Sequence, residues 1–185
     1  MRIVGGEKRS RLLTAPEGTE TRPTADKVRE ALFNILQSRV YDAHVLDLYA
    51  GSGALALEAL SRGAADAVLC DQDRKAAAAI RKNIAALAYG DRTCFLQMPD
   101  AAALSAVKRE GRRFDLIFLD PPYRMDTAPV CERLLDDGLL APDARIVIEH
   151  RKETPPALSE RFEVISVHHY GITGLTVCRA VREEG

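Results

Sequence analysis

Short apolar runs alternate along the chain with longer stretches in which apolar residues recur at helical spacing. A buried strand is typically a continuous apolar run of roughly four to eight residues, whereas a helix needs about ten or more, so length separates the two. Repeated strand and helix units predict a doubly wound, parallel α/β sheet. The predicted strands are 44–48, 67–70, 94–97, 114–119 and 144–149, and the predicted helices between them are 54–62, 73–88, 100–109 and 127–140.

The chain closes with two further apolar runs, 162–167 and 174–181, joined by residues 168–173 without a helix. Parallel neighbours need a long crossover connection, so these two runs are expected to pair as antiparallel strands. The predicted fold class is therefore a doubly wound, seven-stranded, mostly parallel α/β sheet of the Rossmann-like kind, with an antiparallel strand pair at its C-terminal end.

The first forty residues do not follow this pattern. Residues 1–20 contain a glycine pair that marks a turn, and within residues 2–11 four cations lie beside a single acid, Glu7, which predicts a small basic hairpin over 1–20. Residues 21–40 contain apolar positions at helical spacing, which predicts a helix over 25–36. We find no linker or repeat and expect one domain over 1–185. The cations are Arg2, Lys8, Arg9 and Arg11.

The composition of the 185 residues, 46% hydrophobic and 29% charged, excludes an intrinsically disordered chain. The 26 Lys and Arg residues nearly balance the 27 Asp and Glu residues, although nucleic-acid binding normally relies on excess positive charge. Net charge averages over regions with different roles, so the cations near the N-terminus still offer a local site for phosphates. The balance also predicts weak affinity for arbitrary RNA.

The four cysteines form no C-x-x-C pair, and without zinc-ligand spacing we expect no metal site. Three of them fall in predicted strands and one in a predicted helix, as buried small residues do. We see no apolar leader and no run near the roughly 20 residues of a membrane span, and we expect a cytoplasmic protein without membrane contact.

The segment from Asp47 to Ala56 joins the first predicted strand to a helix. Gly51 and Gly53 permit a sharp turn and a close approach of the backbone to a ligand, and Ala56 permits close helix packing. Asp71 follows the second predicted strand, where an acid accepts hydrogen bonds from ribose hydroxyls in dinucleotide-binding proteins. The combination predicts a nucleoside ligand and leaves open a nicotinamide dinucleotide or S-adenosylmethionine.

The predicted strand 114–119 runs directly into Asp120-Pro-Pro-Tyr123, here called the DPPY tetrad. Ligands of open parallel sheets bind beyond the carboxyl ends of the strands, so the tetrad lies where an active site is expected. The prolines hold carbonyl oxygens as acceptors beside the Asp120 carboxylate, and Tyr123 adds a flat stacking face. These groups suit a planar base with an exocyclic amine that receives a methyl group from a bound sulfonium.

The glycine loop Asp47-Leu-Tyr-Ala-Gly-Ser-Gly53 and the DPPY tetrad together resemble class I S-adenosylmethionine-dependent amino-methyltransferases. Further stretches make the resemblance more specific, because with them nearly the whole chain is similar to the bacterial 16S ribosomal RNA guanine-N2 methyltransferase family. These stretches are Met1-Arg-Ile-Val-Gly-Gly6, Thr21-Arg-Pro-Thr24 with Val28 to Leu36, and Leu57-Glu-Ala-Leu-Ser-Arg-Gly63. The resemblance implies transfer of methyl from S-adenosylmethionine to N2 of a specific guanine in 16S RNA, within a small-subunit particle, and we expect a monomer.

The resemblance also implies roles for individual residues, and it places the helix within 21–40 on the cofactor side. The implied catalytic residues are Asp120, Pro121, Pro122 and Tyr123. The implied cofactor-binding residues are Asp47, Gly51, Ser52, Gly53, Asp71, Asp100, Ala101 and Thr24. The candidate RNA-binding residues are Arg2, Lys8, Arg9, Arg11 and Arg22, and Arg22 is equally a candidate for the cofactor carboxylate. The family usually has Glu in place of Asp71, and Asp73 is expected to cap the following helix.

Three alternatives remain from the sequence. An amino-methyltransferase for DNA adenine-N6 or another RNA base shares the tetrad, although the chain has no room for a large DNA-recognition insert. A nicotinamide-dependent oxidoreductase explains the glycine loop but gives the tetrad no role. A non-catalytic RNA-binding module uses only the N-terminal cations and has no affinity for a cofactor.

Overall fold

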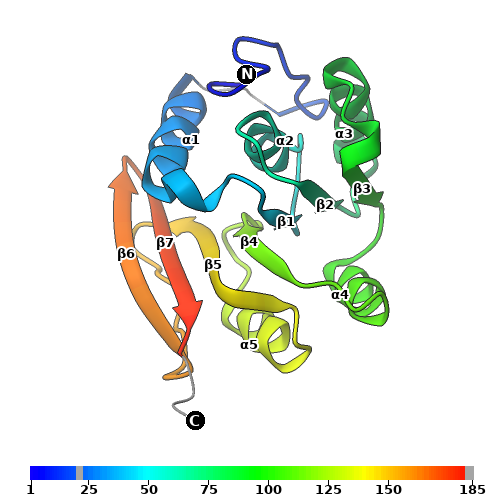
Figure 1. Cartoon of the computed structure of the whole chain (residues 1–185). Helices are drawn as coiled ribbons and strands as arrows, with labels where there is room; N and C mark the ends of the chain where they lie inside the picture. Colours follow the sequence, from blue (N-terminus) through cyan, green and yellow to red (C-terminus); the bar gives the residue numbers. More distant parts are fainter. Residues whose placement is uncertain (20–22, 182–185) are drawn as a thin grey trace.

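The computed structural model describes residues 1–19 and 23–181, with only the backbone of residues 23 and 24. The strands in this part of the chain are β1 (His44–Asp47), β2 (Asp66–Cys70), β3 (Thr93–Leu96), β4 (Phe114–Leu119), β5 (Leu140–Arg151), β6 (Phe162–Tyr170) and β7 (Thr173–Ala180). They form one sheet in the order β3-β2-β1-β4-β5-β7-β6 (Figure 1). Strands β1 to β5 run parallel, and β7 is antiparallel to β5 and β6. The predicted sheet is confirmed.

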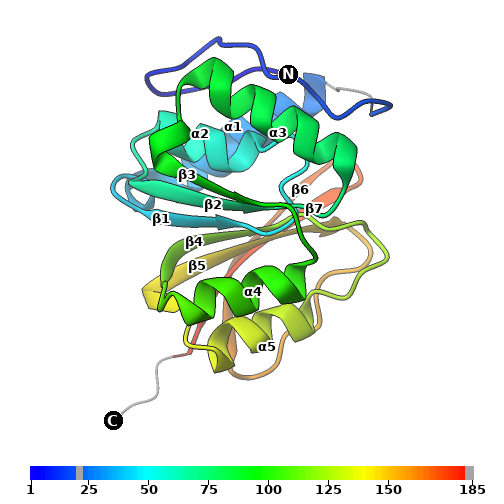
Figure 2. The same cartoon turned by 90° about the vertical axis from the view of Figure 1, so that its right-hand side faces the viewer.

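Helices cover both faces of the sheet, as a doubly wound topology requires (Figures 1 and 2). One face carries α1 (Pro23–Leu36), α2 (Ala54–Ser61) and α3 (Arg74–Leu87), and the other carries α4 (Asp100–Arg109) and α5 (Ala128–Asp136). Short 3-10 turns, η1 (Gln37–Arg39) and η2 (Gly90–Arg92), follow α1 and α3. The Asp73 side chain accepts a hydrogen bond from the Ala76 amide at 2.8 Å, which confirms the predicted cap of α3.

Side chains alternate between the two faces along each strand, because the strand period is two residues. Leu69, Phe118 and Val147 pack toward α1, α2 and α3, while Ile117 and Ile148 pack toward α4 and α5. Both faces are covered, which explains why the strands read as continuous apolar runs. Each fully buried side chain of this size contributes about 1.5–3 kcal/mol to folding. The same alternation decides which way polar residues at the strand ends point.

The junction between α5 and β5 differs from the prediction. The helix predicted over 127–140 is too long, because Gly138 adopts φ 67° and turns the chain after α5 ends at Asp136. Leu140 then pairs with Phe114 at the start of β4. Strand β5 therefore begins before the residues in which the apolar run predicts it.

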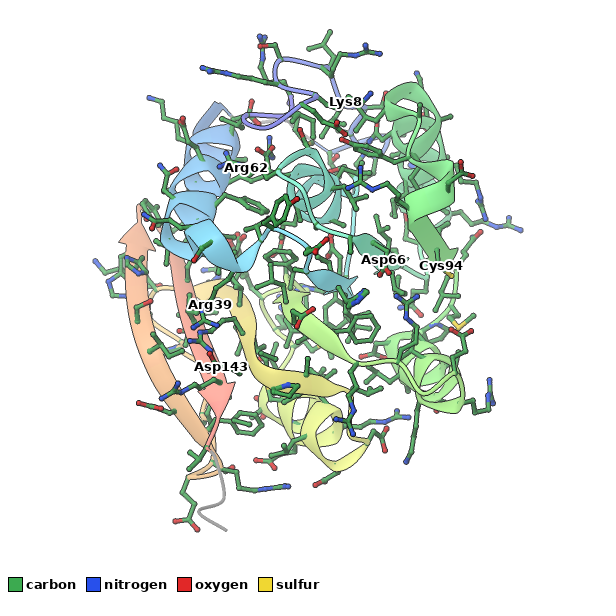
Figure 3. The ribbon with its side chains drawn as sticks, in the orientation of Figure 1. Lys8, Arg39, Arg62, Asp66, Cys94 and Asp143 are labelled. Carbon is green, nitrogen blue, oxygen red and sulfur yellow. The ribbon has the colours of Figure 1, made fainter. Side chains whose placement is uncertain are left out.

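The two edge strands account for two further differences. Cys94 on β3 is exposed at the outer edge of the sheet, so the prediction that it is buried is wrong, while the other three cysteines are buried (Figure 3). Strand β6 extends to Tyr170 and includes His168 and His169, which the pattern assigns to a connection. An edge strand has a neighbour on one side only, so its apolar pattern is weaker.

Residues 1–14, here called the N-terminal segment, fold back on themselves and lie over α2 and α3 on the outside of that helix layer (Figure 2). The Ser10 amide donates to the Ile3 carbonyl at 2.8 Å, and the Leu13 amide donates to the Met1 carbonyl at 3.0 Å. The described backbone has an antiparallel bridge between Arg2 and Leu12 but no regular strand in this segment. The chain reverses direction as the predicted hairpin does, but the two sides of the turn do not form regular strands.

Glu58 on α2 fastens the N-terminal segment to the body of the protein. The side chain is fully buried, and its two oxygens accept hydrogen bonds from the backbone amides of Val4 at 2.8 Å and Gly5 at 2.7 Å. Arg29 of α1 and Arg62 after α2 supply the compensating charge at 3.3 and 2.9 Å (Figure 3 labels Arg62). Every oxygen of this buried carboxylate is therefore satisfied.

The glycine pair serves this docking as well as the turn. A Cβ on Gly6, where φ is 76°, would lie 1.9 Å from the Ser61 carbonyl oxygen, so only glycine allows the close approach. The Ser61 hydroxyl donates to the Gly5 carbonyl at 2.7 Å and accepts from the Lys8 amide at 2.9 Å. The segment is an integrated part of the structure and not a loose appendage.

Candidate active site

Four acids lie at the carboxyl ends of adjacent parallel strands, and we call this set the carboxylate edge. Asp47 ends β1, Asp71 follows β2, Asp120 follows β4, and Glu149 lies near the end of β5. Asp47 is in register with Leu69 and Phe118, which face α1 to α3, and each other acid lies two residues beyond a side chain of that face. Strand alternation therefore directs all four carboxyl groups to one side of the sheet.

The glycine loop turns sharply above this edge. Gly51 has φ 58°, and a Cβ placed there would meet no atom within 4 Å, so the space in front of it is open. Gly53 has φ 80° at the start of α2, and a Cβ there would lie 3.0 Å from Leu69. The Gly51 amide donates to Asp71 at 2.9 Å, and the other Asp71 oxygen accepts from the Asp73 amide at 2.9 Å. The loop and the predicted ribose acceptor are thus brought together.

Asp47 is buried without a full set of partners. Its Oδ2 accepts a hydrogen bond from the Ala56 amide at 3.2 Å, whereas Oδ1 has no partner among the described residues. Burial raises the pKa of Asp47 to about 7, and the nearby Asp120 and Asp71 act in the same direction. A buried carboxyl oxygen without a donor is costly, so this position suits a ligand that brings an N–H or a positive charge.

Tyr49 joins the glycine loop to the start of α4. Its hydroxyl donates to Asp100 at 2.7 Å, and burial followed by this hydrogen bond raises the pKa of Tyr49. The other Asp100 oxygen accepts from the Ala101 amide at 2.7 Å, and Ala101 itself is exposed. The sequence indicates Asp100 and Ala101 but not Tyr49, because their connection depends on how β1 and the end of β3 lie together in space.

The DPPY tetrad begins directly at the end of β4. Pro121 is buried, whereas Pro122 and Tyr123 are exposed, so the proline pair anchors the turn and leaves an aromatic face accessible. Solvent reaches Asp120, yet the protein surrounds its carboxyl group closely enough that burial raises its pKa to about 6. The guanidinium of Arg151 lies 5.4 Å from the centre of the Tyr123 ring.

A cavity of about 360 Å³ adjoins the tetrad, between the tetrad loop and the connection after β5. Its lining includes Pro121, Tyr123, Glu149 and Pro155. Sequence reasoning missed Glu149, although an acid closing the apolar run 144–149 is a visible signal. Burial and then the neighbouring Asp120 raise the pKa of Glu149 to about 8. The two carboxyl groups are therefore close enough to affect each other.

Ser52 has a different environment from the one implied by its predicted role. Its hydroxyl is largely buried and donates to the Met1 sulfur at 3.4 Å, so only the backbone of Ser52 remains for a ligand. The Ser52 carbonyl accepts from Asn83 of α3 at 2.9 Å, and the same amide group bonds the Thr14 backbone. The N-terminal segment and α3 thus hold the glycine loop in place.

The candidate RNA-binding residues lie mostly on the surface. Arg2, Arg9 and Arg11 are exposed, and Arg11 donates to the Ala86 carbonyl at the end of α3 at 3.0 Å. Lys8 is half-buried, with its ammonium group 5.6 Å from the centre of the Tyr89 ring. Arg22 lies outside the described residues, as does the side chain of Thr24.

The described residues contain neither a cluster of metal ligands nor a membrane-spanning helix. No group of three or more His, Cys, Asp or Glu side chains in ranges 1–19 and 25–181 is placed to hold a metal ion. No helix in the described part of the chain is long and apolar enough to cross a membrane.

Comparison with known proteins places this geometry in a family. The family described as "Conserved hypothetical protein 95" matches residues 1–179. The ribosomal RNA small subunit methyltransferase D of Escherichia coli strain K12 is 38% identical over 186 aligned positions, covering 100% of this chain and 90% of that protein. The chain belongs to the ribosomal RNA small subunit methyltransferase D family.

Other members and solved structures agree with this assignment. The ribosomal RNA small subunit methyltransferase D of Haemophilus influenzae is 32% identical and covers 93% of this chain and 90% of its own length. The structure of yhhF from Escherichia coli has a TM-score of 0.85 and 32% identity, covering 99% of both chains. Membership in the ribosomal RNA small subunit methyltransferase D family confirms the resemblance seen in the sequence.

Proposed function

We propose that the protein transfers a methyl group from S-adenosylmethionine to the exocyclic N2 of a guanine in 16S ribosomal RNA. The observation that carries the proposal is that the DPPY tetrad and the glycine loop share one edge of the sheet, in a family of small-subunit ribosomal RNA methyltransferases. A cofactor and a base bound at this edge would lie side by side, as direct transfer between them requires.

The residues present fit S-adenosylmethionine. The buried Oδ1 of Asp47 lacks a hydrogen-bond donor among the described residues, and the ammonium group of the methionine part supplies both a donor and a positive charge. The open space before Gly51 admits the methionine part, and Asp71 retains lone pairs for the ribose hydroxyls. Asp100 and Ala101 would meet the adenine, with Tyr49 fixing the Asp100 carboxylate. The backbones of Ser52 and Gly53 complete the loop, and α1, which carries Thr24, lies on the same face.

The chemistry supplied by bound S-adenosylmethionine is an electrophilic methyl group whose carbon–sulfur bond breaks as the bond to nitrogen forms. The protein orients the amine that accepts it. Asp120 and the Pro121 carbonyl accept the two N–H groups of the amine, which directs the nitrogen lone pair out of the ring plane, and Tyr123 stacks on the base. After transfer the nitrogen loses one proton, and Asp120, with its pKa raised to about 6, is a suitable acceptor.

The RNA would be positioned by phosphate contacts rather than by base readout over most of its surface. The exposed cations Arg2, Arg9 and Arg11 are suited to this role, and Lys8 and Arg22 extend the set in sequence. The positive charge is modest, so a structured small-subunit particle is the proposed substrate, bound by a single copy of the protein in the cytoplasm. The whole chain acts as one methyltransferase domain in this proposal.

The test is the identity of the methylated nucleoside. Small-subunit particles from cells lacking the enzyme are incubated with the protein and tritiated S-adenosylmethionine, the RNA is digested, and the labelled nucleoside is identified by chromatography and mass spectrometry. We expect N2-methylguanosine. Label in N6-methyladenosine or another nucleoside would show that guanine N2 is not the target. Absence of label in both particles and free RNA would contradict methyl transfer itself.

A further inference from the structure

Glu149 stands beside Asp120 on the side away from the glycine loop. Leu119 of β4 is in register with Ile148 of β5, so the next residues, Asp120 and Glu149, are neighbours across two adjacent strands. Glu149 also lines the cavity that adjoins Pro121 and Tyr123. It therefore borders the place where the proposed function puts the target base.

The described residues provide no hydrogen-bond donor for the Glu149 carboxyl group. The imidazole of His150, which lines the same cavity, already has partners, because Nδ1 donates to the Arg151 carbonyl at 2.7 Å and Nε2 accepts from the Thr176 hydroxyl at 2.8 Å. The Arg151 guanidinium lies over the Tyr123 ring. A half-buried carboxyl group next to a second carboxyl group is costly to ionise, which is why the pKa of Glu149 is raised to about 8 in the free protein. An N–H donor brought by a ligand stabilises the ionised carboxylate and so reduces that cost.

The strand order indicates which ligand supplies these donors. The proposed cofactor residues Asp47, Asp71 and Asp100 lie at the ends of β1, β2 and β3, all on one side of β4. Strand β5, which carries Glu149, lies on the other side of β4. A group that approaches both Asp120 and Glu149 is therefore the base and not the cofactor.

Guanine carries the donors that this pair of acceptors requires. Its ring nitrogen N1 bears a hydrogen and is adjacent on the same edge to the N2 amine. In adenine and cytosine, the corresponding ring nitrogen next to the amine has a lone pair instead, and a carboxylate would repel it. We propose that Glu149 is a specificity-determining residue that accepts a hydrogen bond from N1–H of the target guanine while Asp120 holds the amine. This inference rests on the proposed function and names the group that selects its base.

The test replaces the target guanine by 2-aminopurine, which keeps the amine but has no hydrogen on N1. The modified guanine is first mapped, and particles are then reconstituted with RNA carrying guanine or 2-aminopurine at that position. The assay is run at about pH 8.5, where most of Glu149 is ionised even in the free protein. For the unaltered protein, kcat/KM should be about 10- to 100-fold higher for guanine, the range expected of a hydrogen bond to a charged group. Glu149→Leu should reduce this preference to within about threefold, mainly by slowing reaction with guanine.

Two further variants control for packing and for general charge. Glu149→Gln retains one acceptor oxygen in the same volume and should keep a preference between those of the unaltered protein and Glu149→Leu. Glu153→Leu removes an exposed carboxylate that does not line the cavity and should leave the preference unchanged. Calorimetric affinity for S-adenosylmethionine should stay within about threefold in all three variants, because Glu149 does not meet the cofactor.

The outcomes separate the two proposals. If the unaltered protein makes N2-methylguanosine and both Glu149 variants keep its full preference for guanine over 2-aminopurine, the role of Glu149 is wrong while the proposed function stands. If the unaltered protein methylates a different base, the proposed function itself is wrong. Should Glu149→Leu fail to fold, an unchanged preference in Glu149→Gln still overturns the inference.

Discussion

Buried carboxylates occur in two regions of this molecule with opposite surroundings. At the junction of the N-terminal segment with α2, Glu58 is fully buried and receives two backbone amides and two guanidinium groups. At the carboxylate edge, Asp47 is equally buried but has one oxygen without a partner among the described residues. The partners of a buried acid, rather than its burial, therefore distinguish an acid that holds the fold together from one that keeps an oxygen available to a ligand.

The two carboxyl groups also affect the stability of the protein in different ways. A satisfied carboxylate stabilises the fold only while all its partners remain, and losing one side of the arrangement leaves uncompensated charge. An unsatisfied carboxyl group destabilises the protein alone and is stabilised when a ligand supplies the missing donor. Substitutions in the two regions are therefore expected to separate stability from activity.

The largest expected effect is on catalysis at the carboxylate edge. In the proposed function Asp120 accepts a hydrogen bond from the target amine, so kcat for methyl transfer should fall about 10²- to 10⁴-fold in Asp120→Ala. Affinity for S-adenosylmethionine, measured by isothermal titration, should stay within about threefold, because the proposal assigns Asp120 to the base and not to the cofactor. Transfer at the unaltered rate, measured with tritiated cofactor on small-subunit particles, would remove Asp120 from the chemistry.

The next effect is on folding at the N-terminal junction. Glu58→Gln leaves Arg29 and Arg62 without their shared counter-charge and should lower the free energy of unfolding by about 3–5 kcal/mol. For a chain of this size that corresponds to a loss of about 6–20 °C in Tm. Glu30→Gln, an exposed change on α1, is the matched control and should stay within about 0.5 kcal/mol. Equal melting temperatures for the two variants would contradict the anchoring role of Glu58.

A third effect is the pH dependence of stability. Folded Asp47 has a pKa raised to about 7, so it holds a proton that the unfolded chain releases above its ordinary value near 4. The contribution of Asp47 to the stability of the free protein should therefore be greatest below about pH 4. This contribution should be lost as the pH rises through about 7. The pKa values of Asp120 and Glu149 are also raised, to about 6 and about 8, so their contributions to stability also decrease as the pH rises.

Asp47→Asn removes this titration, so the free energy of unfolding should decrease less with pH than in the unaltered protein. The difference should be at most about 4 kcal/mol between pH 4 and 7, at about 1.4 kcal/mol per pH unit. Urea unfolding at a series of pH values measures the change. A fall of the same steepness in Asp47→Asn would show that the carboxyl group of Asp47 titrates normally in the folded protein.

The smallest expected effect concerns whether the N-terminal segment does more than stabilise the fold. Arg9 is exposed, so Arg9→Ala should leave Tm unchanged while it lowers affinity for ribosomal RNA a few-fold and reduces the slope of log affinity against log salt by about 0.7–0.9. Arg9→Lys should retain the slope. An unchanged slope in Arg9→Ala would leave the segment with its structural role alone.

The sequence predicts the strands, the helices and the glycine loop well, because their signals are local. The alternation of apolar runs and helical stretches identifies every strand of the sheet, and Asp120 follows from its position after an apolar run. Errors occur where a neighbouring strand or a turn decides the outcome, as for the end of α5 at Gly138 and the exposure of Cys94 on an edge strand.

The features that the sequence does not reveal depend on contacts between distant residues. Glu58 lies in a stretch that resembles the family, yet its role requires knowing that Val4 and Gly5 lie against α2. Glu149 acquires its meaning from the register of β5 with β4, and Tyr49 from its contact with Asp100. Pairing register and long-range docking are not encoded in any short segment, so these partners emerge only from the fold.

The comparison of the two carboxylates is tested most directly by measuring the free energy of unfolding of Asp47→Asn and Glu58→Gln at pH 7, each with and without S-adenosylmethionine. We expect Glu58→Gln to be less stable by about 3–5 kcal/mol and to gain as much from the cofactor as the unaltered protein, about 2.7 kcal/mol at 100 times Kd. Asp47→Asn should be at least as stable as the unaltered protein without cofactor and should gain less from the same cofactor concentration. Loss of stability in Asp47→Asn equal to that in Glu58→Gln, with a full gain from the cofactor, would contradict the assignment of the carboxylate edge to ligand binding.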